Sequence, residues 1–171
     1  MIILPAEHPL DFKRPPVITL LLILLNTLIY FGYQGGDAAR EEHAVKSYLD
    51  AGLLSRERDS FISAFSTEHQ LTAEQQHDFG QLRSKQMARI LLSDLQFEQR
   101  LHQDPGYLAD PHWQAARQPA EAARDQISNY RFGFIPAKFT VQGLFGAMFL
   151  HGSVDHLLGN MLFLFIFGFA L

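Results

Sequence analysis

The chain has 171 residues and a formal net charge of −4, and it contains no cysteine. Disulfide bonds, thiolate metal ligands and cysteine nucleophiles are therefore excluded within this sequence. Its 14 lysine and arginine residues are interspersed with 18 acidic residues, so no basic face favours nucleic acid as a partner. Apolar residues gather in two regions on either side of a long polar middle, a segregation that is typical of a membrane protein.

The first apolar region follows a short polar tail, residues 1–14. Residues 15–34 begin with two prolines, which suit the first turn of a helix, and end in aromatic residues, which favour a membrane–water interface. At ~1.5 Å per residue this helix approaches the ~30 Å thickness of the hydrocarbon core. We predict a retained transmembrane helix. A cleaved signal peptide is the alternative, but acidic Glu7 and Asp11 precede the apolar run and no small-residue cleavage site ends it.

The polar middle, residues 35–130, predicts a helical insert. Asp37 is expected to cap a helix that Gly52 weakens. Thr72 and Gln75 have the spacing of a capping box, which predicts the start of one long helix reaching about His102.

Turn chemistry at Asp104-Pro105-Gly106 is expected to end that long helix. Pro111 and Pro119 are each expected to begin a short helix. The insert is expected to pack on itself or on the membrane surface, and the alternative is a docking module for a partner. Five histidines lie in it without the spacing of metal ligands, so we expect solvated surface residues: His43, His69, His77, His102 and His112.

The second apolar region, residues 131–171, divides into two parts. Residues 132–149 mix large apolar side chains with glycine and proline, which favours an interfacial, partly re-entrant segment. Ser153 is a candidate N-cap for a helix that runs from Val154 to the end of the chain. This helix ends in apolar residues without a polar flank, and its last carbonyls would lack partners in hydrocarbon. We therefore expect the sequence to be truncated.

The polar side chains within this last helix are the candidates for a functional role. His156 and Asn160 lie about 40° apart on a helical wheel and share a face with Gly152. His151 lies about 140° from His156, which argues against a two-histidine metal site; no metal or cofactor is expected. The shared face suits two N–H donors aimed at one oxygen, as in an oxyanion hole. It also suits hydrogen bonds between membrane helices, and the spacing leaves both interpretations open.

The segment FLHGSVDHLLGNMLFLFIFG resembles the second transmembrane helix of rhomboid intramembrane serine proteases. That helix has a histidine at its start, a second histidine five residues later and an asparagine four residues further on. The resemblance is close over residues 131–169 and only generic over 15–34. It implies an all-α membrane protein, a partial rhomboid-like bundle in which two transmembrane helices flank the polar helical insert.

The resemblance also implies a function. Rhomboid proteases cleave the transmembrane segments of other proteins in the bilayer, with a serine in Gly-x-Ser-Gly on the fourth helix and a histidine on the sixth. By position, His156 and Asn160 resemble side chains that stabilise the oxyanion, and His151, Gly152 and Ser153 resemble structural residues at the helix start. The sequence contains no Gly-x-Ser-Gly, so the chain corresponds to the N-terminal part of a protease and is expected to be inactive alone.

Two non-catalytic functions remain open beside the protease. One is a rhomboid-like pseudoprotease, which binds membrane proteins without cutting them. The other is a membrane-anchored helical interaction domain, in which His156 and Asn160 only join helices. The resemblance implies a multi-pass protein of the bacterial inner membrane with a cytoplasmic N-terminus. The sequence indicates neither the oligomeric state nor the substrate.

Overall fold

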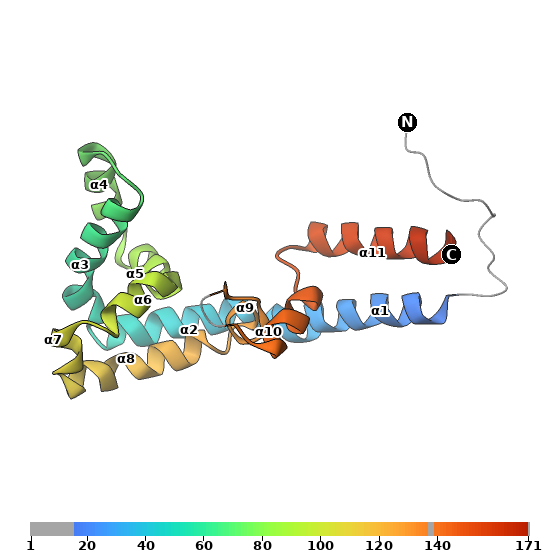
Figure 1. The fold of residues 1–171 in the computed structure, drawn as a ribbon, viewed down its shortest axis with the longest axis horizontal. Coiled ribbons are helices and arrows are strands. Elements are labelled where there is room, and N and C mark those ends of the chain that lie inside the picture. Colours follow the sequence, from blue (N-terminus) through green and yellow to red (C-terminus); the bar gives the residue numbers. More distant parts are fainter. Residues whose placement is uncertain (1–15, 137–138, 171) are drawn as a thin grey trace. The chain divides into compact units, whose positions relative to one another are not determined.

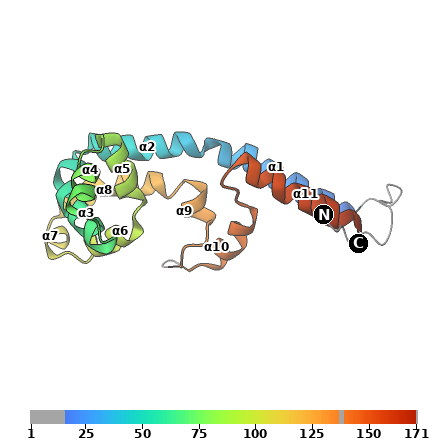
Figure 2. The same ribbon diagram turned by 90° about the horizontal axis from the view of Figure 1, so that it is seen from above.

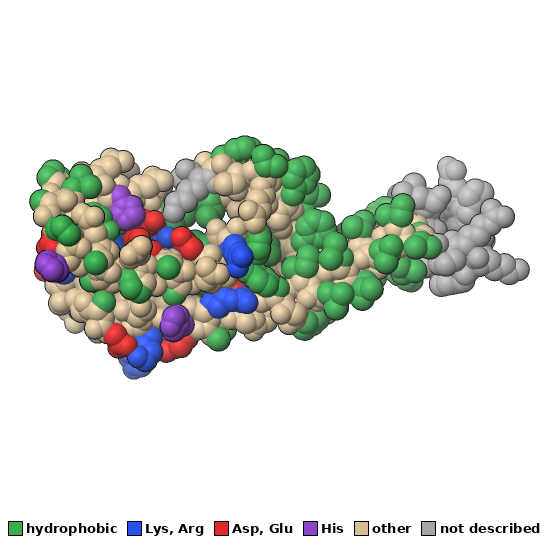
Figure 3. Space-filling view, turned by 90° about the horizontal axis from the view of Figure 1, so that it is seen from below, with side chains coloured by type: hydrophobic (Ala, Val, Ile, Leu, Met, Phe, Trp, Pro, Cys, Tyr) green, Lys and Arg blue, Asp and Glu red, His purple; other side chains and the backbone are tan. Residues whose placement is uncertain are grey.

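The computed structural model describes residues 16–136 and 139–170, and within these ranges every regular element is a helix. This confirms the predicted all-α class. The chain forms two compact units. The apolar unit comprises Met1–Asp37 and Ser128–Leu171, and the polar unit comprises Ala38–Ile127. In the space-filling view (Figure 3), charged side chains cluster over the polar unit and hydrophobic side chains cover the helices of the apolar unit.

The apolar unit begins with α1, Val17–Leu28, followed by one π-helical stretch, η1 (Ile29–Tyr33), and a 3₁₀ turn, η2 (Gln34–Gly36). These elements lead without a break into α2, and the helical run Val17–Asp50 contains a window of mean hydropathy 1.8. The run is therefore long and apolar enough to cross a membrane. Its apolar side chains in α1 are largely exposed, as lipid-facing residues would be.

The C-terminal part of the apolar unit contains α9 (Ser128–Phe132), α10 (Val141–Gly146), the 3₁₀ turn η4 (Ala147–Phe149) and α11 (Val154–Ala170). The segments Val141–Phe149 and Val154–Gly168 meet at 86°, and together they are apolar enough to count as one broken span. Helix α11 begins where the sequence predicts.

Helices α1 and α11 lie side by side in both ribbon views (Figures 1 and 2). They come close together at Gly168, where an added Cβ would lie 2.8 Å from the Cβ of Thr19. Real Cβ atoms essentially never come that close, so glycine is required for this approach. Small residues are the usual means by which membrane helices come close together.

The polar unit is a bundle of short helices with its own core. Its elements are α2 (Asp37–Asp50), α3 (Leu53–Glu68), α4 (Ala73–Gly80), α5 (Ser84–Ser93), α6 (Leu95–Leu101), α7 (Pro105–Leu108) and α8 (Pro111–Arg124). Tyr48, Phe61, Met87 and Leu91 are fully buried in the core. The insert therefore packs on itself, one of the two arrangements expected for it.

Several boundaries differ from those predicted. The capping box of Thr72 and Gln75 is confirmed, but the single long helix that it was expected to begin is wrong. Arg83 and Asp94 adopt extended backbone angles, which divide the segment into α4, α5 and α6. The side chain of Asp94 accepts a hydrogen bond of 2.8 Å from the Phe97 N–H, so a new N-cap stabilises the second break.

The prediction that Asp37 caps a helix is also wrong. The helical run continues through it from η2, and its carboxylate instead accepts hydrogen bonds from the Ser128 hydroxyl and, at 3.0 Å, from the Ser128 N–H. Asp37 thus joins the two ends of the apolar unit. Pro119 does not begin a helix but lies inside α8. Gly52, which was expected only to weaken this helix, lies beyond its end: α2 stops at Asp50, and Gly52 adopts a left-handed φ of 69°.

Buried ion pairs hold the core of the polar unit, and sequence patterning gave no sign of them. Arg117 and Glu57 pair with both side chains fully buried. Glu57 also accepts hydrogen bonds from the Tyr48 hydroxyl, at 2.9 Å, and from the Trp113 indole N–H, at 2.8 Å. Burial, followed by the charge of Glu57, raises the pKa of Tyr48 far above its usual value. One carboxylate therefore connects three helices.

Candidate functional site

The residues that the sequence singled out lie at the start of α11. Ser153 precedes the helix, and its hydroxyl accepts a hydrogen bond of 3.2 Å from the His156 N–H. This is the geometry of an N-cap, as expected for Ser153. An added Cβ at Gly152 would meet nothing within 4 Å, so local packing does not require glycine there.

His151 is held at this position by a residue far away in the sequence. Its N–H donates to Gln34 Oε1 at 3.0 Å, and its carbonyl accepts from Gln34 Nε2 at 3.0 Å. The amide of Gln34 therefore satisfies both backbone groups of His151, as a neighbouring strand would. The sequence analysis missed this contact. In the sequence, the one sign of this contact is the amide side chain of Gln34 at the end of an apolar run, where polar groups need a hydrogen-bond partner.

The imidazole of His151 is buried, with 4% of its surface exposed. Its Nδ1 lies 3.2 Å from the Phe149 carbonyl; because a carbonyl only accepts, Nδ1 carries the hydrogen. The ring contacts Tyr30 edge-on at 6.5 Å and His156 at 5.3 Å between centroids. The expectation that His151 points away from His156 is therefore wrong. The helical-wheel angle does not apply, because His151 lies before the N-cap, outside the helix.

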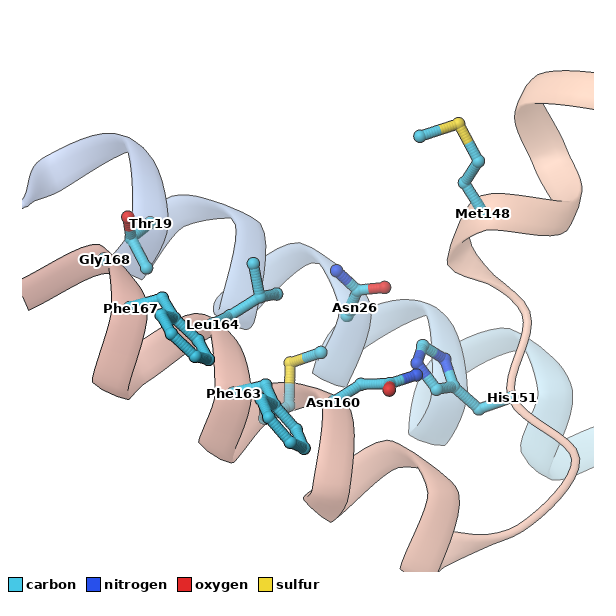
Figure 4. A pocket seen from close by; sticks show the side chains of 10 residues that line it. Thr19, Asn26, Met148, His151, Asn160, Phe163, Leu164, Phe167 and Gly168 are labelled. Atoms are coloured by element: carbon cyan, nitrogen blue, oxygen red, sulfur yellow. The ribbon is translucent and has the colours of Figure 1, made fainter. Parts of the chain in front are cut away.

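A cavity of about 480 Å³ lies between α1 and α11. Figure 4 shows Asn160 from α11 pointing toward the ring of His151, with Asn26 on the facing helix. The cavity is lined by Thr19, Asn26, Met148, His151, Asn160, Met161, Phe163, Leu164, Phe167 and Gly168. His156 does not line it, although it contacts the His151 ring, and its side chain is exposed like that of Asn160. The structure thus gathers His151, His156 and Asn160 in one polar cluster.

Asn26 is a second polar residue that the sequence analysis did not assign to the site. Only 5% of its surface is exposed, and its Nδ2 donates to the Leu22 carbonyl at 2.8 Å. Among the described residues, its Oδ1 has no hydrogen-bond partner. A buried amide in an otherwise apolar span was visible in the sequence, but its packing against α11 was not.

A geometric cluster suited to a metal ion occurs in the polar unit, at Glu98, His102 and Glu121. Glu98 pairs with Arg124 and Glu121 with Arg117, so arginine already balances both carboxylates. The five histidines of the insert are exposed, as expected.

The cluster at the start of α11 can donate hydrogen bonds but holds no activated nucleophile in the described residues. Asn160 offers two N–H groups and His156 an imidazole. The Ser153 hydroxyl is engaged as a helix cap. The arrangement is suited to stabilising charge on an oxygen atom.

The fold and site together define an all-α, membrane-type protein with a polar cluster on an apolar helix. The family model described as Rhomboid domain matches residues 138–171, which span α10, η4 and α11 with every candidate residue of the cluster. This segment is therefore similar to a rhomboid domain, and the rhomboid family consists of membrane-integral serine proteases. No curated protein and no solved structure matches the chain.

Proposed function

We propose that the chain is the N-terminal part of a rhomboid-type intramembrane serine endopeptidase that cleaves transmembrane segments of other membrane proteins. The observation that carries this proposal is the Rhomboid domain match over 138–171, which contains His156 and Asn160 one helical turn apart. Their role is to stabilise the oxyanion, while His151, Gly152 and Ser153 shape the start of α11. The protein is a multi-pass protein of the bacterial inner membrane.

The proposed peptide-bond cleavage uses two side chains of this chain, His156 and Asn160, together with a serine and a histidine base from elsewhere in the longer protein. A serine hydroxyl attacks the scissile carbonyl carbon, its proton passes to a histidine base, and the electron pair of the C=O bond moves onto the oxygen. Hydrogen bonds from His156 and Asn160 stabilise that negative oxygen more than the neutral carbonyl, which lowers the barrier. The serine and the base belong to segments outside this sequence, because it contains no Gly-x-Ser-Gly.

The test uses the proposed longer protein, in which this chain is followed by the nucleophile and base. His156→Ala and Asn160→Ala are each expected to lower kcat by about 10²–10³, with KM nearly unchanged. The 171-residue chain alone is expected to show no cleavage of a transmembrane substrate. Full proteolysis by the chain alone would contradict the proposal.

A pseudoprotease is the second candidate, favoured by the same missing Gly-x-Ser-Gly. It predicts binding of membrane proteins without cleavage. A fluorophosphonate probe separates the two, since it labels only a serine activated as a nucleophile. Labelling of the longer protein at an intramembrane serine supports the protease, and no labelling supports the pseudoprotease.

A further inference from the structure

The oxygen of the Asn26 side chain is a buried acceptor without a donor in the described structure. Such a group in an apolar environment is costly, because neither water nor a protein N–H replaces its lost hydration. The cost is greater in a membrane span, where the surrounding lipid offers no donor. A donor for Asn26 should therefore lie in the cavity that Asn26 lines.

The polar side chains of that cavity are few, and each can be tested as the donor. Thr19 lies seven residues before Asn26 on α1, about 10 Å along the helix axis, which is too far. His151 uses its Nδ1–H on the Phe149 carbonyl, and in the imidazole tautomer that carries its hydrogen on Nδ1, Nε2 is an acceptor. The amide of Asn160 remains.

Asn160 has the required properties. Figure 4 shows its side chain on α11 extending toward the His151 ring, and Asn160 and Asn26 line the same cavity. Its side chain is exposed and makes no hydrogen bond to another described residue, so it can turn toward Asn26. Its Nδ2 carries two hydrogens. One can bind Asn26 while the other stays available for a second acceptor.

We propose that Asn26 is a positioning residue: its Oδ1 accepts one N–H of Asn160, fixes the direction of that amide and leaves the second N–H for the oxyanion. The first membrane helix thereby takes part in the active site through a side chain that does not touch the substrate. The catalytic half of this statement rests on the proposed function. The hydrogen bond itself does not.

The hydrogen bond can be measured in the 171-residue chain in detergent micelles. The sequence contains only three asparagines, Asn26, Asn129 and Asn160, so selective ¹⁵N labelling of asparagine side chains gives three pairs of N–H signals, one pair for each NH₂ group. Asn129 is exposed and serves as an internal reference. One N–H of Asn160 is expected to exchange with water roughly two- to twelvefold more slowly than its geminal partner, the range of a single hydrogen bond.

Variants separate the hydrogen bond from general packing. Asn26→Leu removes the acceptor and is expected to abolish the slow exchange at Asn160. Asn26→Asp keeps an acceptor oxygen and is expected to retain it. The matched control is Thr27→Val. Among the described residues, the Thr27 hydroxyl donates to the Ile23 carbonyl of its own helix, so this change should leave the Asn160 signals unchanged. Equal exchange of both Asn160 hydrogens in the original chain, or slow exchange that survives Asn26→Leu, would overturn the proposal.

A kinetic experiment in the proposed longer protein distinguishes the two proposals. Asn26→Leu is expected to lower kcat and Asn26→Asp to restore it, with KM unchanged. If Asn160→Ala lowers kcat while Asn26→Leu does not, the positioning role fails and the proposed function stands. If the amide signals behave as expected but Asn160→Ala leaves kcat unchanged, the oxyanion role fails and the hydrogen bond stands.

Discussion

Replacement of Glu57 by glutamine should strongly destabilise the polar unit. The Glu57 carboxylate is fully buried, pairs with buried Arg117 and accepts hydrogen bonds from Tyr48 and Trp113. Removing one partner of a buried ion pair costs about 3–5 kcal/mol when the other charge is left uncompensated; because Arg117 keeps Glu121 as a partner, we expect a cost at the lower end of this range. A domain of this size has only about 5–15 kcal/mol of stability in total, so Glu57→Gln should remove a large part of it.

The assay is urea unfolding of the chain in detergent, followed by tryptophan fluorescence. Trp113 is the one tryptophan of the chain and lies in the polar unit, so the signal reports that unit. The matched control is Glu42→Gln, which removes an exposed ion pair with Lys85 and should cost less than about 1 kcal/mol. Equal effects of the two variants would refute the argument that burial makes the Glu57 pair important.

Three further predictions follow from individual contacts. Gln34→Leu removes both hydrogen bonds to the His151 backbone, so the His151 N–H should exchange with water roughly tenfold faster, which corresponds to about 1.4 kcal/mol; unchanged exchange would contradict the observed pairing. Gly168→Val should push α11 away from Thr19 on α1. Spin labels on exposed positions of α1 and α11 should then report a longer distance between the two helices. An unchanged distance would argue against the close packing of α1 and α11. Burial raises the pKa of the Tyr48 hydroxyl above 10.0 in the folded chain, so just above pH 10 the unfolded chain loses this proton and the folded chain keeps it. The free energy of unfolding should therefore fall as the pH rises above 10, and Tyr48→Phe should reduce this fall.

The sequence was sufficient where local chemistry decides the structure. Helical class, the capping box at Thr72 and the N-cap at Ser153 depend on residues a few positions apart, and the structure bears them out. Helix breaks were harder to predict. Arg83 and Asp94 interrupt a helical pattern because packing of the short helices around one core prevails over local propensity.

Long-range contacts could not be predicted from the sequence. Gln34 and His151 are 117 residues apart, and no periodicity relates them. Charged residues such as Glu57 and Arg117 are usually solvated, so their burial becomes visible only when the helices are placed together. The orientation of His151 was missed for a different reason: a helical wheel was applied to a residue that lies outside the helix.

The central claim is that His156 and Asn160 stabilise an oxyanion in a rhomboid-type protease. It is tested most directly by kcat for cleavage of a transmembrane substrate by the longer protein, compared between the original sequence, Asn160→Ala and the control Thr27→Val. If His156 and Asn160 stabilise the oxyanion, kcat should fall by about 10²–10³ for Asn160→Ala and stay unchanged for the control. A kcat that Asn160→Ala leaves unchanged would contradict it and would leave Asn160 as a residue that only joins helices.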